Sequence, residues 1–463
     1  MANHGLIVGL DIGTNTIKAL AADVRNQQSN IVGVGRSVSH GVKKGVVVDI
    51  DAAANDIRQT LAQVNEQAGQ TVTDVIVSLP AEGIQITHVN GQITVEDSQH
   101  ISYRDVNAVV QEALKGQTSV DREVVDLIPV DFVVDDFDGI QDPNDMVGMR
   151  LAMSGIAYTA PKNVLGNLKM AIEKAGLNLR DCVLTPLATS KTVLSEAEQE
   201  FGSILLDMGA GQTTATVIKD NQLKFISSFP AGGDNISRDI STVLSIGGYD
   251  AEMLKLDSGI ALTDLANNND KLMIQKVGKT APEEISENYL AQIIEARVDQ
   301  ILDKLGEKLS MVSALEMPGG ITVVGGTSAM EGIPNAVTNK LGLATKRFAP
   351  DDIGLHHPGF ANAWAIVQYA AQQLPIQLIT KQALYGLPLQ QSKGMPVVQS
   401  VERVPQRTEK AKPMPAVKPT SVEPVVEVDE NENDIDDIEE SNKNRQANAK
   451  KSPIGDFFRE FFD

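Results

Sequence analysis

The stretch LIVGLDIGTNTIK, residues 6–18, runs from an apolar strand pattern into an acid, a glycine turn and small hydroxyl residues. The stretch ILLDMGAGQTT, residues 204–214, repeats the same order of residue types. Glycine and small hydroxyl residues let backbone N–H groups approach a phosphate closely, and an acid at the end of a strand can hold a hydrated Mg²⁺ ion. One such turn is a weak signal. Two of them can face each other across a cleft and hold a polyphosphate from both sides, so the pair predicts a nucleotide site.

A third glycine-rich turn occurs in ITVVGGTSAM, residues 321–330, where a strand pattern ends in two glycines and a helical pattern begins. The backbone of these glycines could support a flat adenine ring. The alternative is a tight strand-to-helix turn that needs only small residues. The motif alone does not separate the two interpretations.

The composition indicates a multidomain protein that does not bind nucleic acid. The chain has 463 residues, too many for one ordinary hydrophobic core. Its formal net charge of −21 argues against a protein that wraps duplex nucleic acid. Cys182 is the only cysteine; we expect it to be a buried core residue in a reducing compartment. The first residues lack a signal-peptide pattern and no apolar run reaches a membrane-spanning length, so we expect a soluble, cytoplasmic protein.

Residues 1–385 alternate short runs rich in Val and Ile with longer helical patterns, which favours mixed or parallel sheets covered by helices. The predicted strands include 6–10, 74–79, 203–208 and 321–326. The predicted helices lie near 51–68, 104–115, 161–175, 186–199, 233–244, 283–312 and 360–373. After residue 386 the composition shifts to polar and charged residues, which predicts a disordered linker over 386–452 with an acidic run at 423–440.

The last residues, SPIGDFFREFFD, form a different pattern. One apolar stripe at helical spacing contains Ile454, Phe457, Phe458, Phe461 and Phe462. Ser452 suits the N-cap of a helix and Pro453 suits its first position. We therefore predict an amphipathic helix over 453–463 that lies on a membrane surface. The alternative is a helix that docks into a groove of a partner protein.

The order and spacing of the three glycine-rich turns resemble those of the actin, Hsp70 and sugar-kinase superfamily. Residues 183–190 (VLTPLATS) and 360–364 (FANAW) resemble its two interdomain connectors. The resemblance implies an α/β, actin-like fold. Two RNase-H-like halves, each with a smaller subdomain, would enclose a nucleotide cleft that holds ATP and Mg²⁺.

The same resemblance implies roles for individual residues in the cleft. Magnesium would be held through water by Asp11 and Asp207. The phosphates would be bound by Gly13, Thr14, Asn15, Thr16, Lys18, Gly209, Ala210, Gly211, Gln212 and Thr213. The adenosine would contact Gly325, Gly326 and Thr327, with Glu252 and Lys255 at its ribose and base.

Within this superfamily the chain resembles the bacterial FtsA cell-division family. The resemblance is carried by GVKKGVVVD (41–49), VSLPA (77–81), AGGDNISRDI (231–240) and the terminal helix pattern. It implies a polymerising adaptor that tethers the FtsZ ring to the cytoplasmic face of the cell membrane at the division septum. The implied partners are the C-terminal tail of FtsZ, further copies of the chain in a head-to-tail filament, the membrane surface and other division proteins.

The resemblance also implies domain boundaries. The first half would comprise 1–84, 165–200 and 346–385, with an inserted subdomain at 85–164. The second half would comprise 201–241 and 313–345, with a small subdomain at 242–312 that docks FtsZ. Arg297, in the helix predicted there, is the candidate contact residue, and the alternative for that helix is an ordinary solvated amphipathic helix.

Two positions depart from the family pattern. Thr185 stands where the first connector commonly has Glu, and Ala215 stands where the second turn commonly continues with Asp. Because activating a water molecule needs an acid, an amide or a similar group, we expect at most slow ATP hydrolysis. The alternatives are a carbohydrate kinase of the same fold, a chaperone of the Hsp70 type and a pilus-assembly actin-like protein. The first lacks an evident catalytic aspartate here, the second would need a further β-rich domain, and neither a kinase nor a pilus protein accounts for the terminal helix.

Overall fold

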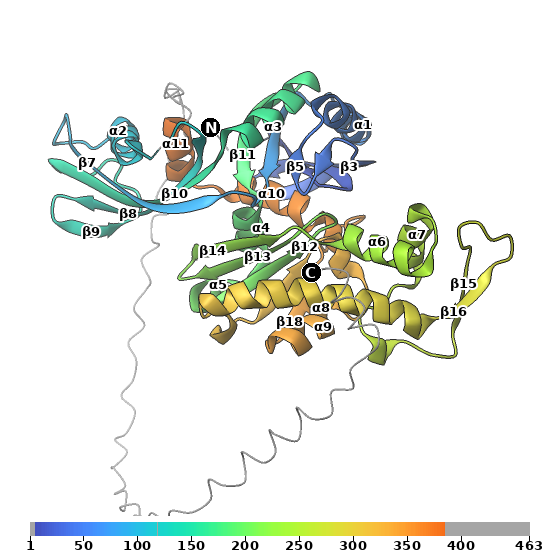
Figure 1. The fold of residues 1–463 in the computed structure, drawn as a ribbon. Helices are drawn as coiled ribbons and strands as arrows, with labels where there is room; N and C mark the ends of the chain where they lie inside the picture. Colours follow the sequence, from blue (N-terminus) through green and yellow to red (C-terminus); the bar gives the residue numbers. More distant parts are fainter. Residues whose placement is uncertain (1–4, 118, 385–463) are drawn as a thin grey trace, which may run out of the picture. The chain divides into compact units, whose positions relative to one another are not determined.

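The structure is a computed structural model, and we describe its residues 5–117 and 119–384 (Figure 1). They belong to the compact unit Met1–Gln390. The predicted linker (386–452) and the predicted terminal helix (453–463) lie outside the described residues. Among the described helices, none is both long and apolar enough to cross a membrane.

The first sheet has five strands in the order β11-β6-β1-β2-β3. The strands are β1 (Gly5–Ile12), β2 (Thr16–Arg25), β3 (Gln28–Val38), β6 (Asp74–Leu79) and β11 (Asn178–Leu184). β1, β2 and β3 form an antiparallel meander, and β6 runs parallel to both β1 and β11. α1 (Ile50–Ala68) packs against β3, and α3 (Lys162–Lys174) packs against α1. A two-stranded hairpin of β4 (Val42–Lys43) and β5 (Val46–Val47) precedes α1.

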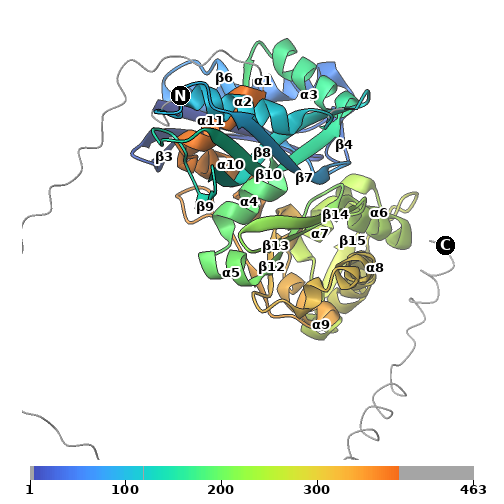
Figure 2. The ribbon, with the colours of Figure 1, turned by 90° about the vertical axis from the view of Figure 1, so that its left-hand side faces the viewer.

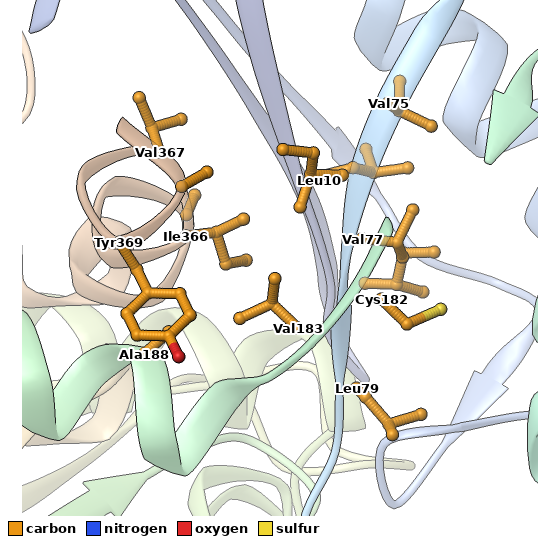
Figure 3. Close-up of a cluster of buried hydrophobic side chains, with 14 of the residues drawn as sticks. Leu10, Val75, Val77, Leu79, Cys182, Val183, Ala188, Ile366, Val367 and Tyr369 are labelled. Carbon is orange, nitrogen blue, oxygen red and sulfur yellow. The ribbon is translucent and has the colours of Figure 1, made fainter. Parts of the chain in front are cut away.

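A core of aliphatic side chains fills the space between the first sheet and α10 (Ala361–Gln372) (Figure 3). Leu10 and Val183 of the sheet face Ile366 and Val367 of the helix, and all four are buried. Burying each such side chain contributes about 1.5–3 kcal/mol. Cys182 is buried in the same region, which raises the pKa of its thiol to about 12. The prediction of a buried core cysteine is confirmed.

The second sheet is antiparallel, with the order β7-β10-β8-β9. Its strands are β7 (Gln85–Thr94), β8 (Arg122–Val134), β9 (Phe137–Ile140) and β10 (Arg150–Pro161). α2 (Tyr103–Leu114) packs against β7 and β10, and α11 (Pro375–Leu384) packs against α2 and β8. Ile376 and Ala383 of α11 therefore join the apolar core of this sheet, although the predicted boundaries assign 346–385 to the first half.

The third sheet has the order β14-β13-β12-β17-β18. Its strands are β12 (Ser203–Met208), β13 (Thr213–Lys219), β14 (Gln222–Phe229), β17 (Ile321–Val324) and β18 (Thr345–Arg347). The accompanying helices are α6 (Gly233–Leu244), α7 (Gly248–Ser258), α8 (Glu287–Met311) and α9 (Ile333–Leu341). α8 contacts α6, α9 and β14. A separate hairpin consists of β15 (Lys271–Ile274) and β16 (Glu283–Ser286).

The first and third sheets have the same topology. In each, a three-stranded antiparallel meander (β1-β2-β3 or β12-β13-β14) pairs through its first strand with a parallel strand (β6 or β17). This repeat confirms the predicted pair of α/β halves. The two predicted connectors meet, because α4 (Thr185–Val193) packs against α10 (Figure 2). The Thr189 hydroxyl donates a hydrogen bond to the Asn362 amide oxygen over 3.0 Å.

One predicted helix is divided in the structure. The prediction joined 186–199 into a single helix, whereas α4 ends at Val193 and α5 (Glu196–Phe201) begins after Ser195. Leu194 is extended, and Ser195 forms a capping box with Glu198, in which each residue's side chain accepts a hydrogen bond from the other's backbone N–H. This prediction was wrong because a Ser-x-x-Glu pattern satisfies the N–H groups of a new helix start.

Candidate functional site

The three predicted glycine-rich turns line one cavity of about 750 Å³. The turn between β1 and β2 and the turn between β12 and β13 belong to equivalent positions of the first and third sheets. The turn after β17 contributes the third part of the wall. All of the predicted cofactor-binding residues line this cavity except Thr213. The three turns, which lie far apart in the sequence, therefore come together in the fold as predicted.

The first two turns have matching geometry and touch each other. Gly13 N–H donates to the Thr16 carbonyl over 3.2 Å, and Gly209 N–H donates to the Gln212 carbonyl over 3.0 Å. A Cβ atom at Gly211 would lie 2.7 Å from the Thr14 hydroxyl oxygen, so only glycine allows this approach. The two turns thus close on the cavity from opposite halves of the fold.

Asp11 and Asp207 place two carboxylates at the wall of this cavity. Burial raises the pKa of both carboxyl groups, and the charge of Asp11 raises the pKa of Asp207 further. The Asn362 amide donates to Asp207 over 2.8 Å, and Lys18 Nζ lies 3.7 Å from Asp11. A cation held between two such groups would stabilise their ionised forms.

The donor set fits magnesium held through water. Carboxylate oxygens are the ligands that Mg²⁺ prefers, and this ion usually keeps several of its waters and binds one or two carboxylates. Asp11 and Asp207 supply two such groups, and no cluster of three or more His, Cys, Asp or Glu side chains suited to a metal occurs in the described part of the chain. The structure therefore offers a hydrated divalent cation two outer contacts rather than a complete protein cage.

The far end of the cavity is built by α6, α7 and the third turn. Lys255 Nζ donates to Glu252 over 2.7 Å and to the Gly233 carbonyl over 3.1 Å, so both α7 side chains are fixed against the start of α6. The Thr327 hydroxyl donates to the Gly209 carbonyl over 2.8 Å and joins the third turn to the second. Gly325 has a φ of +89°, and a Cβ atom there would lie 2.4 Å from an Asp207 oxygen. This position requires glycine for both reasons.

Thr213 does not line the cavity. Its side chain is fully buried and its hydroxyl donates to the Ala231 carbonyl over 2.9 Å, so it stabilises the base of the second turn. Thr185 does line the cavity, but its hydroxyl donates to the Leu79 carbonyl over 2.9 Å. Ala215 is buried in β13 and is absent from the lining. The lining carboxylates are Asp11, Asp207, Glu252, Asp257 and Glu331.

Further polar residues, to which the sequence analysis gave no role in the cleft, also line the cavity, among them Arg36, Ser78, His357 and Asn362. Ser78 accepts a hydrogen bond from the Ile12 N–H over 3.1 Å and supports the first turn. Asn362 lies inside a predicted connector, and its polar amide side chain could have indicated a residue of the cavity wall. Arg36 and His357 come from segments without a recognisable motif.

Arg297 is buried between two helices, and its contact with FtsZ stays a prediction. Its guanidinium is 7 % exposed and donates to both carboxylate oxygens of Asp239, over 2.5 and 2.8 Å. Asp239 belongs to α6 and is 4 % exposed. A long polar side chain on a helix suggested a solvated face, but here it forms a buried ion pair between α8 and α6.

Comparison with known proteins supports a single family. The family model described as "Cell division protein FtsA" matches residues 204–365, and "SHS2 domain inserted in FTSA" matches residues 81–159. The cell division protein FtsA of Enterococcus faecalis is 38 % identical over the full length of both chains. FtsA of Bacillus subtilis is 33 % identical over 81 % of this chain and 86 % of that protein.

Among solved structures, one described as "PilM-PilN type IV pilus biogenesis complex" is similar with a TM-score of 0.57. It is 14 % identical in sequence and covers 79 % of this chain and 99 % of that chain. At this identity the likeness shows the fold alone, and the predicted actin-like α/β fold is confirmed. The curated relatives separate the family from pilus proteins and carbohydrate kinases. The chain belongs to the FtsA family of cell-division proteins.

Proposed function

We propose that the chain binds ATP with Mg²⁺ in the cavity described above and acts as a polymerising adaptor. In this role it tethers FtsZ to the cytoplasmic face of the membrane at the division septum and recruits other division proteins. The observation that supports nucleotide binding best is the contact between the two glycine turns, each from the equivalent hairpin of one half. Such a pair suits a polyphosphate that is held from both sides.

In the proposed complex, the turns 13–16 and 209–212 bind phosphate oxygens through backbone N–H groups other than those of Gly13 and Gly209, and Lys18 adds a positive charge. Asp11 and Asp207 hold the water shell of the magnesium ion. When bound, Mg²⁺ neutralises phosphate charge. Glu252 and Lys255, together with 325–327, contact the adenosine. Because the Thr185 hydroxyl is already engaged and Ala215 has no polar group, we propose that hydrolysis is slower than about one turnover per second.

The membrane part of the proposal rests on the sequence of 453–463. Burying its four phenylalanines is worth roughly 6–12 kcal/mol before the cost of immobilisation. The stripe is accompanied by three acidic residues, Asp456, Glu460 and Asp463, which offset the three basic residues Lys450, Lys451 and Arg459. One copy therefore binds anionic lipid weakly, and head-to-tail polymerisation presents many copies to one surface, which multiplies the affinity. FtsZ binds through its C-terminal tail to the subdomain at 242–312.

Liposome co-sedimentation tests the proposal. The full chain is compared with a chain that ends at residue 452, each with Mg-ATP and vesicles of mixed neutral and anionic lipid. We expect the full chain to pellet with the vesicles and the shortened chain to stay in the supernatant. A full chain that remains in the supernatant, at concentrations where it polymerises, would contradict the tether. ATP binding by the same samples is measured separately by calorimetry, so that the two parts of the proposal can fail independently.

A further inference from the structure

A row of positively charged or hydrogen-bond-donating side chains lines the cavity beyond the two turns. We name Lys18, Arg36 and His357 the donor row; all three line the cavity. Lys18 lies directly opposite Asp11 in the pairing of β1 with β2, and Arg36 lies opposite Lys18 in the pairing of β2 with β3. Residues directly opposite each other in antiparallel strands place their side chains on the same face of the sheet. The row therefore starts beside a buried carboxylate and leads to the edge strand.

Lys18 and Arg36, the two cations of the donor row, can each donate further hydrogen bonds to a ligand. Lys18 is 13 % exposed, and its contact with Asp11 at 3.7 Å is longer than a hydrogen bond. The backbone N–H and carbonyl of Arg36 bind the Gln63 side chain, which fixes this part of β3. Within residues 5–117 and 119–384 we find no hydrogen bond or ion pair of the Arg36 guanidinium. Its five donors are available to an anion.

His357 adds a neutral donor to the row. Its Nδ1 accepts a hydrogen bond from the Gly359 N–H over 3.0 Å, which leaves the ring proton on Nε2. Burial lowers the pKa of the ring, and the charges of Arg36, Lys18 and Arg347 lower it further. At neutral pH the imidazole is therefore an uncharged N–H donor.

We propose that the donor row is a second anion position in the cavity, which binds inorganic phosphate beside bound ADP. Two cations and one N–H donor match the charge and acceptor oxygens of HPO₄²⁻. Exposure increases along the row, from buried Asp11 through Lys18 to exposed Arg36 at the edge of the sheet. The row thus also provides a path between the phosphate turns and solvent. The inference rests on the proposed binding of nucleotide.

The test is equilibrium dialysis of radiolabelled phosphate against the full chain saturated with Mg-ADP. Arg36→Gln removes the guanidinium, and His357→Asn keeps an acceptor near the Nδ1 position but removes the Nε2 donor. Arg25→Gln is the matched control, because Arg25 lies on β2, pairs with Asp23 and is 81 % exposed. We expect R36Q to bind phosphate about tenfold more weakly and H357N several-fold more weakly. R25Q should keep the wild-type affinity.

The inference is overturned if the wild-type protein shows no saturable phosphate binding, or if R36Q and R25Q behave alike. It is also overturned if R36Q weakens ATP binding as much as phosphate binding, because Arg36 would then belong to the nucleotide site. A wild-type protein that binds neither ATP nor ADP marks a different failure, that of the proposed function, and the inference fails with it.

Discussion

Replacing Arg297 with methionine should destabilise the protein strongly, because its side chain forms a buried ion pair with Asp239. The Arg297 guanidinium and the Asp239 carboxylate are both more than nine-tenths buried and share two hydrogen bonds. Methionine preserves much of the side-chain volume, so the main loss is the ion pair. Removing one partner of a buried pair leaves an uncompensated charge and costs about 3–5 kcal/mol. This is a large share of the roughly 5–15 kcal/mol that stabilises an ordinary domain.

Urea unfolding followed by far-UV circular dichroism measures this loss. Lys304→Met is the control on the same helix, because Lys304 is 52 % exposed and lies 3.7 Å from Glu307. We expect its effect to stay within about 0.5 kcal/mol. The double variant Arg297→Met with Asp239→Leu removes both charges. It should recover most of the stability, since replacing a buried pair by apolar residues is often neutral.

Binding of an FtsZ C-terminal peptide separates a structural role from a docking role. If Arg297 only holds α8 against α6, peptide binding falls in R297M and returns in the double variant. The reasoning is refuted if R297M unfolds at the same urea concentration as the wild type. It is also refuted if the double variant is fully stable and still fails to bind the peptide, because the guanidinium would then touch FtsZ directly.

Three further substitutions, at Lys381, Gly325 and Asp207, have expected effects on stability or on ATP binding. Lys381→Met should cost about 3–5 kcal/mol at about pH 7.5, because Lys381 lies 2.7 Å from Asp181 and 3.7 Å from fully buried Asp126. Burial raises the pKa of Asp126, so the folded protein favours the protonated, uncharged carboxyl group. The loss of unfolding free energy in K381M should therefore be smaller at about pH 5, and urea unfolding at the two pH values measures it. Gly325→Ala should weaken ATP binding at least about tenfold in a calorimetric titration, because the positive φ and the contact with Asp207 both oppose a side chain, whereas Gly166→Ala, with open space around it, should not. Asp207→Asn should weaken the Mg²⁺ dependence of ATP binding, because only Asp11 then remains to hold the water shell of the ion. In the wild type, binding with Mg²⁺ should strengthen as the pH rises through the raised pKa of Asp207, since only the ionised carboxylate attracts the cation.

The strands of the two halves were predictable because their signal is local. Residues 74–79 and 203–208 were predicted from continuous apolar, β-branched runs, and they match β6 and β12. The helices α7, α9 and α11 were missed. α7 has little separation of polar and apolar faces and buries only Ala251 and Lys255, so periodicity could not reveal it. α11 is short, and its burial depends on β8 and α2, which lie far from it in sequence.

The candidate site shows the same division between local and distant information. Each glycine turn is a short continuous motif, so nearly all of its residues in the cavity wall could be predicted from the sequence. The partners that hold Asp207 and Arg297 are distant: Asn362 binds Asp207 across 155 residues, and Asp239 binds Arg297 across 58. Nothing in a single chain marks which polar residue will meet which carboxylate. Whether a charged side chain is buried or solvated depends on such a partner.

The position of α11 bears on how the proposed tether would respond to nucleotide. Lys381 of α11 contacts Asp126 of β8 and Asp181 of β11, so one buried cation joins this helix to both the second and the first sheet. α11 is also the last described helix before the predicted linker. The third sheet carries the other glycine turn, and the connectors α4 and α10 meet between the halves. The two turns touch in this structure, so if they separate when ATP leaves, the third sheet moves relative to the part of the fold to which α11 is fixed. A polymer contact on the third sheet would then be reoriented relative to the start of the linker. This movement would couple the proposed nucleotide site to the proposed membrane helix without any contact between the two.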